Sequence, residues 1–401
     1  MSKYMISEVK TSSDIKEFLK LPKKIYKGYN NWIHPLDNDI EAVFNKEKNK
    51  MFIKGEAVRF LVRDSSSGEC VGRIAAFYNE RVAFQGDLKV GGCGFFESIN
   101  SQEVAFLMFD TVKAWLVSKG MNAMDGPINF GDREMWWGLL TDGFTQPVYG
   151  MNYNHPYYKE LFEAYGFQDY FNGFSFRRDL KTDTLSPMLV EKARRLAENP
   201  SYKFCHIKKS ELDKVALDFC DIYRRAWAKF DSVAPITKED AVNMMLKLKP
   251  IIDEKLIYFA YYNNEPIGFF IMIPDINSTI RPLNGKLDLI GKLRFFYRLK
   301  IKRVGRLALG LIFGVIPEHQ GKGVESGIIN CFKEEVNKGN INYDSLDLAW
   351  VGDFNPLMIR MVEKYVGAVR HKTHTTYRFL FDRNRAFERA PKVSMSRESA
   401  K

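Results

Sequence analysis

The chain contains two copies of one pattern, and this internal repeat limits the possible folds more than any other feature. "VRFLVRDSSSGECVGRIAAFYNE" at 58–80 and "LIYFAYYNNEPIGFFIMIPD" at 256–275 each predict a β-hairpin, with Gly72 and Gly268 at the same place after the turn. The openings match as well, because "MISEVKTSSDIKEFLKLPKKIY" and "KFCHIKKSELDKVALDFCDIY" each predict a strand, a serine cap and an amphipathic helix. The repeat unit is about 190 to 200 residues long, which is the size of a domain.

The ends of the two copies match too. Asn154 precedes Gly166 by the same interval that separates Asn355 from Gly367. Each pair predicts a short helix with Asn near its first residue and Gly just after its last.

The joint between the copies lies at 180–202. A chain of 401 residues is too long for one small core, and Ser186-Pro187 is placed to start a short helix in this joint. We therefore predict an N-terminal domain at 1–183, a linker helix at 184–202, a C-terminal domain at 203–383 and a basic tail at 384–401.

A glycine-rich turn follows an apolar run in the second copy. Leu307 to Ile316 predicts a buried strand, "QGKG" follows at 320–323, and apolar residues then recur at helical spacing up to Gly339. The first N–H groups of such a helix lack internal partners and carry partial positive charge, so the turn could hold a phosphate. A purely structural turn is the alternative. The turn is neither a P-loop nor a dinucleotide fingerprint, because it lacks the residues that both motifs need.

The Q-x-x-G turn after "VIPEH", with its long helix, resembles the coenzyme A pyrophosphate loop of the GNAT superfamily of acyltransferases. "GDFNPLMIRMVEKYVGA" resembles a later segment of that superfamily. The resemblance covers 203–383 well and 1–180 more weakly, through the repeat. It implies an α/β (α+β) fold of two tandem GNAT-like domains, each a mixed, mostly antiparallel twisted sheet flanked by helices.

The same resemblance implies that acetyl-CoA or a longer acyl-CoA binds to the second copy. In the superfamily the loop N–H groups hold the pyrophosphate, the preceding strand pairs with the pantetheine arm, and the Asn orients the thioester. The implied cofactor residues are Phe313, Gly314, Val315, Gln320, Gly321, Lys322, Gly323, Val324, Glu325, Ser326 and Asn355.

Two positions of the second copy depart from the superfamily's pattern. Glu325 stands where Gly or Ala is usual, and a carboxylate beside a pyrophosphate is unfavourable unless it points away or pairs, for example with Lys322. Val362 stands where members often place the tyrosine that protonates the leaving thiolate. Tyr365 is the nearest substitute and is our candidate acid, with a role as a core aromatic as the alternative. The first copy has no Q-x-x-G loop, so we expect only the second copy to bind a coenzyme.

The first copy offers residues for an acceptor site instead. "DGPINFGDREMWWGLLTDGF" at 125–144 is dense in glycine, acids and tryptophan, and "YNHPYY" at 153–158 lies at an expected helix start. Acyl transfer to an amine needs a base, and Glu97 is our candidate. The alternative is that the tryptophans only pack in the core. The candidate substrate residues are Asn129, Asp132, Arg133, Trp136, Trp137, Tyr153 and Tyr157.

A basic segment at 286–306 precedes the apolar strand of the second copy. The whole chain has a formal charge of +11, and this segment holds eight cations and one acid. On a helical wheel Ile290, Leu293 and Tyr297 share one face and most cations lie opposite, which is the pattern of a helix on anionic lipid. Phe295 falls on the polar side, which favours insertion or burial. An ordinary packed helix and RNA contact are the alternatives, and we expect no nucleic-acid partner.

We predict an acyl-CoA-dependent N-acyltransferase whose amine acceptor binds between the copies. The alternatives are long-chain transfer to a lipid-like amine, as in bacterial ceramide synthases, an aminoacyl-tRNA-dependent ligase, and a non-catalytic binding protein. The five cysteines form no C-x-x-C pair and the six histidines no zinc pattern, so we predict no metal site. The absence of an apolar leader or spanning segment predicts a cytoplasmic protein, with peripheral contact at the inner membrane as an extension of this prediction.

Overall fold

The computed structural model describes residues 2–84, 87–131, 133, 135–227 and 236–392. The first half of the chain supplies strands β1 (Tyr4–Glu8), β2 (Gly55–Asp64), β3 (Cys70–Asn79), β4 (Val90–Ser98), β5 (Ala123–Gly126), β6 (Leu139–Asp142) and β7 (Gln168–Asp179). Its helices are α1 (Ser12–Ile25), α2 (Asp37–Val43), η1 (Lys50–Lys54), α3 (Glu80–Ala83), α4 (Gln102–Ser118) and α5 (Tyr158–Tyr165). Helix α6 (Pro187–Ala197) joins the halves.

The second half repeats this order of elements. Its strands are β8 (Tyr202–His206), β9 (Ile257–Tyr262), β10 (Glu265–Pro274), β11 (Leu307–Val315), β12 (Ser345–Gly352) and β13 (Val369–Leu380). Its main helices are α7 (Leu212–Ala226), α8 (Lys238–Leu248), α9 (Asn277–Ile280), α10 (Leu289–Phe296), α11 (Val324–Asn337) and α12 (Pro356–Arg360). Short turns complete it: η2 (Lys209–Glu211), η3 (Glu254–Leu256), η4 (Arg281–Leu283), η6 (Pro317–His319), and the π-helical η5 (Tyr297–Ile301) and η7 (Met361–Val366).

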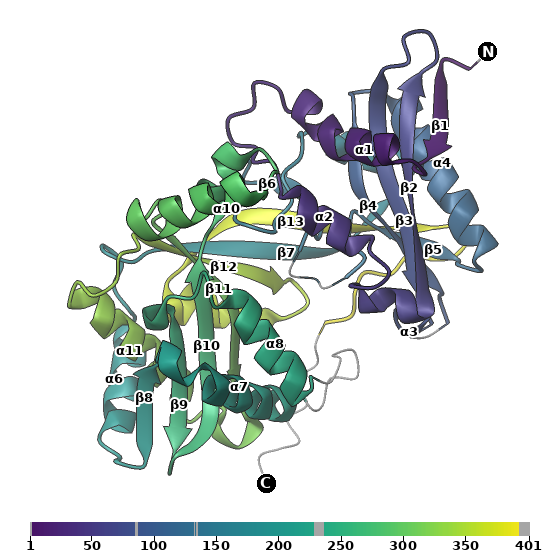
Figure 1. The fold of residues 1–401 in the computed structure, drawn as a ribbon. Coiled ribbons are helices and arrows are strands. Elements are labelled where there is room, and N and C mark those ends of the chain that lie inside the picture. Colours follow the sequence, from purple (N-terminus) through teal and green to yellow (C-terminus); the bar gives the residue numbers. More distant parts are fainter. Residues whose placement is uncertain (1, 85–86, 132, 134, 228–235, 393–401) are drawn as a thin grey trace.

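The described strands form one continuous 13-stranded sheet that runs through both halves (Figure 1). The order is β1-β2-β3-β4-β5-β13-β7-β12-β11-β10-β9-β8, and β6 pairs with β13. The last strand of each half therefore lies against the other half: β13 pairs with β5, and β7 pairs with β12. The predicted fold class of two similar α/β halves is confirmed, and the halves are joined by this strand exchange. The predicted residue boundaries of the domains remain a prediction, and 393–401 of the predicted tail lies outside the described residues.

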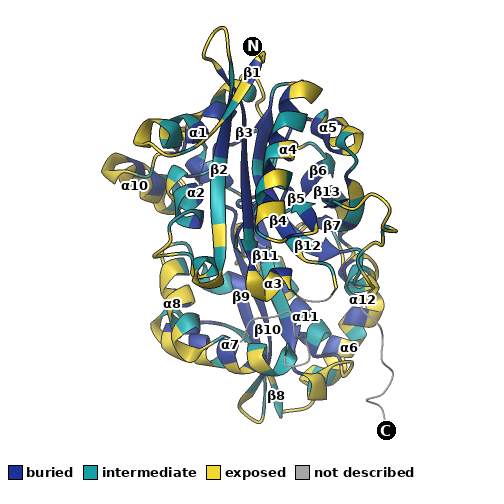
Figure 2. Ribbon diagram, turned by 90° about the vertical axis from the view of Figure 1, so that its right-hand side faces the viewer, coloured by how far each residue is buried: buried dark blue, intermediate teal, exposed yellow. Residues whose placement is uncertain are grey.

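Both faces of the first-half sheet are covered by helices (Figures 1 and 2). Neighbouring residues of β3 point to opposite faces, so Ile74 joins a buried cluster with α4 and α5, while Ala75 joins one with α1 and α2. The equivalent glycines of the repeat have a packing reason. A Cβ at Gly72 would stand 3.0 Å from Val104 of α4, and one at Gly268 would stand 3.4 Å from Ile328 of α11. Each glycine lets the long helix of its half approach the sheet closely.

The local signals were mostly correct. Both hairpins form, and the Ser186 side chain caps α6 by accepting a hydrogen bond from the Leu189 N–H, at 3.3 Å. Gly166 ends α5 in the left-handed conformation, with φ of 105°. The prediction that Asn154 caps this helix was wrong. Its side chain instead bonds both backbone groups of Leu140 in β6, at 2.7 and 3.0 Å, because the chain extends past β6 before the helix starts.

Candidate functional site

The parallel strands β11 and β12 separate part-way along their length. They pair only as far as Gly310 and Leu348, after which β11 continues beside β10 and β12 beside β7. A cavity of about 210 Å³ fills this opening. Its walls are almost entirely apolar and come from the two strands, α11, α12 and η7: Leu311, Phe313, Ile329, Phe332, Leu348, Ala349, Met358, Met361, Val362 and Val366. We call it the apolar slot.

One buried cation lines the apolar slot. The Arg178 side chain is 3% exposed, and burial lowers the pKa of its guanidinium. Its two terminal nitrogens have no hydrogen-bond partner among the described residues. A buried donor without a partner is costly, so a ligand with an acceptor oxygen would stabilise this position.

The glycine-rich turn lies between the strand β11 and the helix α11. Gly321 and Gly323 have φ of 72° and 95°, a region that favours glycine, and a Cβ at Gly321 would meet no atom within 4 Å. The Gln320 amide donates a hydrogen bond to the Val315 carbonyl oxygen, at 2.8 Å, and so ties the turn to the strand. The first N–H groups of α11 face an open turn, which is the geometry of an anion site.

Glu325 is the residue that works against an anion in this turn. Burial raises the pKa of its carboxyl group, while hydrogen bonds from the backbone of Glu325 itself and of Gly321 lower it, as does the charge of Lys192. The carboxylate therefore lies near backbone N–H groups of the turn and of the first turn of α11, where it would compete with a phosphate. The predicted partner Lys322 is exposed.

The other predicted cofactor residues are placed as follows. Phe313 lines the apolar slot, Gly314 packs against Trp227, and Val324 is fully buried. Asn355 caps α12, accepting a hydrogen bond from the Met358 N–H at 3.2 Å. The roles of these residues, and of Ser326 in the first turn of α11, remain predictions.

The candidate acid Tyr365 lies in η7, and its side chain is outside the described residues, so its role remains a prediction. Val362 is 2% exposed and forms part of the apolar wall, so this position supplies packing and no hydroxyl group.

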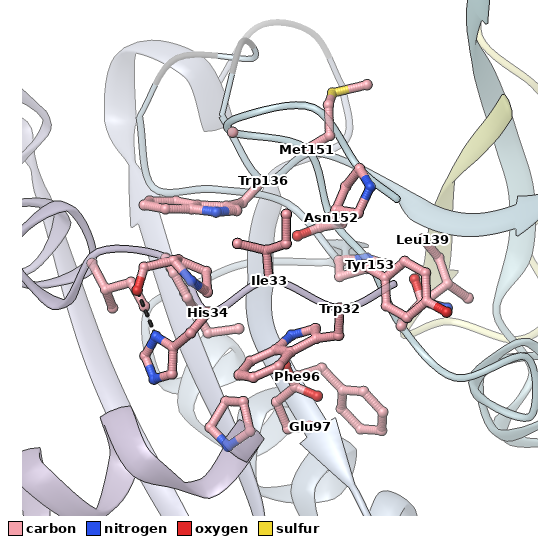
Figure 3. A pocket seen from close by; sticks show the side chains of 18 of the residues that line it. Trp32, Ile33, His34, Phe96, Glu97, Trp136, Leu139, Met151, Asn152 and Tyr153 are labelled. Atoms are coloured by element: carbon pink, nitrogen blue, oxygen red, sulfur yellow. Dashed lines mark hydrogen bonds between the residues drawn. The ribbon is translucent and has the colours of Figure 1, made fainter. Parts of the chain in front are cut away.

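A second, smaller cavity of about 70 Å³ lies in the first half, where β4 and β5 also separate. Figure 3 shows Trp32, Trp136, Asn152 and Glu97 around it. Its walls carry more polar groups than those of the apolar slot, including Arg73 and His34. We call it the polar pocket.

Glu97 sits at the base of the polar pocket in a network of buried groups. Its carboxylate accepts hydrogen bonds from the hydroxyl groups of Tyr26 and Tyr158, at 2.7 and 2.8 Å, and Arg73 Nη2 lies 3.5 Å away. Burial raises the pKa of Glu97, and Arg73 and the two tyrosines oppose the shift. A carboxyl group with a raised pKa in a cavity is a suitable proton acceptor near neutral pH.

The predicted substrate residues come together only in part. Trp136 and Tyr153 line the polar pocket with Glu97. Tyr157 lies beside them and donates a hydrogen bond to the Ser98 carbonyl oxygen, at 2.7 Å. Three other predicted residues do not line the pocket: Asn129 is buried, and Arg133 lies over the Trp137 ring at 5.5 Å. Asp132 is outside the described residues, and its role remains a prediction.

Several residues in and beside the polar pocket were not predicted from the sequence. Trp32 and His34 line the pocket, and Tyr26 donates a hydrogen bond to Glu97. All three come from "IYKGYNNWIHP" at the end of α1 and directly after it. Three aromatic residues and a histidine in a stretch without helical or strand periodicity were an available signal. Arg73 and Tyr158 carried none, because both lie within regular elements.

The apolar slot and the polar pocket border the same hydrophobic cluster. Val148, Ile273 and Leu309 form the buried part of this cluster. Met151 of the polar pocket packs against it, as do Leu311 and Ala349 of the apolar slot.

No family model matches the chain. Two named proteins are similar over nearly its whole length. The bacterial ceramide synthase of Caulobacter vibrioides is 25% identical over 375 residues, which cover 92% of this chain and 95% of that protein. Protein YghO of Escherichia coli is 26% identical over 377 residues, which cover 91% and 92%.

Solved structures decide the fold. A tandem GNAT protein from the clavulanic acid biosynthesis pathway superposes with a TM-score of 0.54, covering 94% of this chain and 98% of that one, at 10% identity. The chain has the tandem GNAT fold. Within this fold the turn before α11 is the predicted coenzyme loop, and its role remains a prediction.

Proposed function

We propose that the protein transfers an acyl group from acyl-CoA to an amine, with the donor in the second half and the acceptor in the first. The single observation that carries the proposal is the pair of cavities that border one hydrophobic cluster. The apolar slot opens between β11 and β12, and Met151 of the polar pocket packs against the same buried residues as Leu311 and Ala349 of the slot.

In this proposal the glycine-rich turn binds the pyrophosphate through the N–H groups at the start of α11. The edge of β11 beyond Gly310 has no described strand beside it on the β12 side, so its backbone groups are available to the pantetheine arm. An acyl donor in the slot would also supply acceptor oxygens near Arg178, whose two terminal nitrogens have no hydrogen-bond partner among the described residues.

The acceptor amine would lie in the polar pocket, with Glu97 as the group that removes its proton. Amine attack on the thioester carbon forms the C–N bond, the C–S bond breaks, and the thiolate of CoA takes up a proton. Tyr26 and Tyr158 orient the Glu97 carboxylate and are positioning residues. Tyr365 remains our candidate for protonating the thiolate.

The apolar character of the slot favours a longer acyl chain over an acetyl group. Its lining residues offer little to a polar group besides Arg178 and Lys333, whereas each buried CH₂ of a chain contributes about 0.8 kcal/mol. Transfer of a long chain to a lipid-like amine is therefore our second candidate. It is also the candidate that fits the name of the ceramide synthase relative.

The test measures the free energy of unfolding with CoA, acetyl-CoA and palmitoyl-CoA, together with release of free thiol in the presence of amines. A ligand at 100 times its dissociation constant adds about 2.7 kcal/mol. We expect stabilisation by thioesters that is lost in Gly323→Glu, and a larger effect of palmitoyl-CoA if the long-chain candidate holds. No stabilisation by any thioester would refute the proposal. A requirement for tRNA would decide for the ligase alternative, and binding without thiol release for the non-catalytic one.

The predicted location in the cytoplasm or at the inner membrane remains a prediction. In the part of the chain that the structure describes, no helix is long and apolar enough to cross a membrane. Membrane contact through residues 286–306 is a separate proposal, because it does not depend on the residues proposed for acyl transfer.

A further inference from the structure

The helix α10 and the turn η5 leave an apolar face open to solvent. The side chains that share this face are large and hydrophobic, and they come from a stretch of 13 residues: Leu289 (76% exposed), Ile290 (61%), Leu293 (65%), Phe296 (45%), Tyr297 (47%) and Ile301 (71%). Apolar patches of this kind on a folded protein mark interaction sites.

The opposite side of the helix holds it to the body of the protein. Gly291 and Phe295 are buried, and Phe295 packs in a cluster with Ile280 and Leu283. Arg298 donates hydrogen bonds to the carbonyl oxygens of Ser278 and Thr279, at 2.9 and 3.2 Å. The alternative of an ordinary packed helix is thus met in part: the helix packs on the body through Phe295, which lay on the polar side of the predicted wheel, and leaves the wheel's apolar face exposed. The exposed apolar face is therefore not a face that the fold itself covers.

Exposed cations surround this face. Lys292 and Arg294 stand on α10, and Lys300, Lys302 and Arg303 follow on or after η5, all of them exposed. The segment 286–306 has a single acidic residue, Asp288, which is used as the N-cap of α10. An apolar face with a basic rim is complementary to a surface that is anionic outside and apolar beneath, which describes an anionic lipid leaflet. RNA would match the cations but leave the apolar side chains in water.

The patch lies close to the polar pocket. Ile33 lines that pocket and packs in the same cluster as Phe295, and Asn277 of α9 also lines it. Figures 1 and 2 both show α10 beside α1 and α2, the helices over this part of the first half. A molecule held in a membrane under α10 would thus be near the proposed acceptor site.

We propose that α10 and η5 dock the protein on an anionic membrane surface, so that an amine resident in that membrane is the acceptor. The membrane docking does not depend on the proposed acyl transfer. Only the inference that the acceptor is a membrane-resident amine rests on that proposed function. The helix lies on the membrane and inserts the apolar face, while the cations bind lipid headgroups.

The experiment floats the full chain with vesicles of phosphatidylcholine alone or mixed with phosphatidylglycerol, without thioester. Ile290→Glu/Leu293→Glu removes the apolar face, and Lys292→Gln/Lys300→Gln weakens the basic rim. The matched controls are Ile53→Glu, at a position 79% exposed in the first half, and Lys247→Gln/Lys249→Gln on and just after α8.

We expect binding to the anionic vesicles only, at least tenfold weaker in the apolar variant and about fivefold weaker per lysine removed. The controls should bind like the wild type. Three results would each overturn the docking proposal: vesicle binding by both α10 variants at the wild-type level, absence of vesicle binding, or binding of labelled RNA in place of vesicles.

Turnover separates the two proposals. Thiol release is measured with one water-soluble amine and one membrane-resident amine in the same vesicles. If both proposals hold, the α10 variants raise the apparent KM for the membrane amine and leave kcat for the soluble amine unchanged. Vesicle binding without turnover would leave docking intact and reject acyl transfer. Equal loss with both amines would reject the membrane-resident acceptor.

Discussion

Two glycines that flank α11 provide a sharp test of the predicted coenzyme loop. Gly321 precedes α11 and Gly339 follows it, with φ of 72° and 73°, and a Cβ at either position would meet no atom within 4 Å. Alanine therefore suffers the same backbone strain and no clash at both sites. The left-handed conformation costs about 1–2 kcal/mol for a residue with a Cβ, and about 0.4–1 kcal/mol is recovered because alanine restricts the unfolded chain. We expect both variants to lose about 1 kcal/mol of unfolding free energy.

Only Gly321→Ala should also lose coenzyme binding. Its methyl group would stand where a pyrophosphate approaches the N–H groups of the turn, whereas Gly339 lies at the far end of the helix. A hydrogen bond to a charged group contributes about 1.5–3 kcal/mol, so loss of one raises the dissociation constant for CoA by about 10- to 100-fold. At a concentration of 100 times the wild-type dissociation constant, the stabilisation by CoA should fall from about 2.7 to about 0.4–1.4 kcal/mol.

The assay is urea unfolding of the wild type and both variants, with and without CoA. Gly339→Ala should keep the full stabilisation by CoA in spite of its lower intrinsic stability. Full stabilisation in Gly321→Ala, or an equal loss in both variants, would refute the placement of the pyrophosphate at this turn.

Three further outcomes follow from single residues. Tyr26→Phe removes a hydrogen bond that lowers the pKa of Glu97, so the acid limb of the pH profile of kcat/KM should move to higher pH. The variant should also lose about 1 kcal/mol of unfolding free energy. An acid limb at the wild-type pH would exclude Glu97 as the base. Val362→Trp fills the apolar slot at a cost of about 1–3 kcal/mol, and thermal shifts should show a greater loss for palmitoyl-CoA than for acetyl-CoA; equal losses would place the chain elsewhere. Burial raises the pKa of Asp275 to about 6, so the folded state binds its proton more tightly than the unfolded state and stability falls as pH rises from about 4 to 6. Asp275→Asn should remove that fall, which amounts to about 2 kcal/mol between pH 4.5 and 7 in urea unfolding, and a parallel pH dependence in the variant would contradict the assignment.

The linear chain was sufficient for features that depend on neighbouring residues. The hairpins at 58–80 and 256–275, the cap at Ser186 and the glycine-rich turn before α11 all follow from local periodicity, caps and turns. The repeat then indicated two similar halves, because the same local signals recur in the same order.

Partners distant in the chain could not be predicted in this way. The alternation of a strand determines which residues share a face but not which strand lies beside it, so the exchange of β7 and β13 between the halves was invisible. The helix α10 shows the same limit. The helical wheel separated apolar from basic residues, but it could not show which side packs on the body. Phe295 is buried because it packs against Ile280 and Leu283, and Ile290 on the other side is exposed.

The candidate site divides along the same line. Glu97 and Trp136 could be named from sequence because acids and tryptophans are conspicuous in a predicted loop or strand end. Arg73 was hidden, because its role exists only where β3, β4 and α1 meet and the Glu97 carboxylate is buried beside it. The chain alone thus determined the elements and the glycine-rich turn before α11. Packing of distant elements created the two cavities and the cluster between them, since burial and pKa shifts arise only from neighbours that the fold brings together.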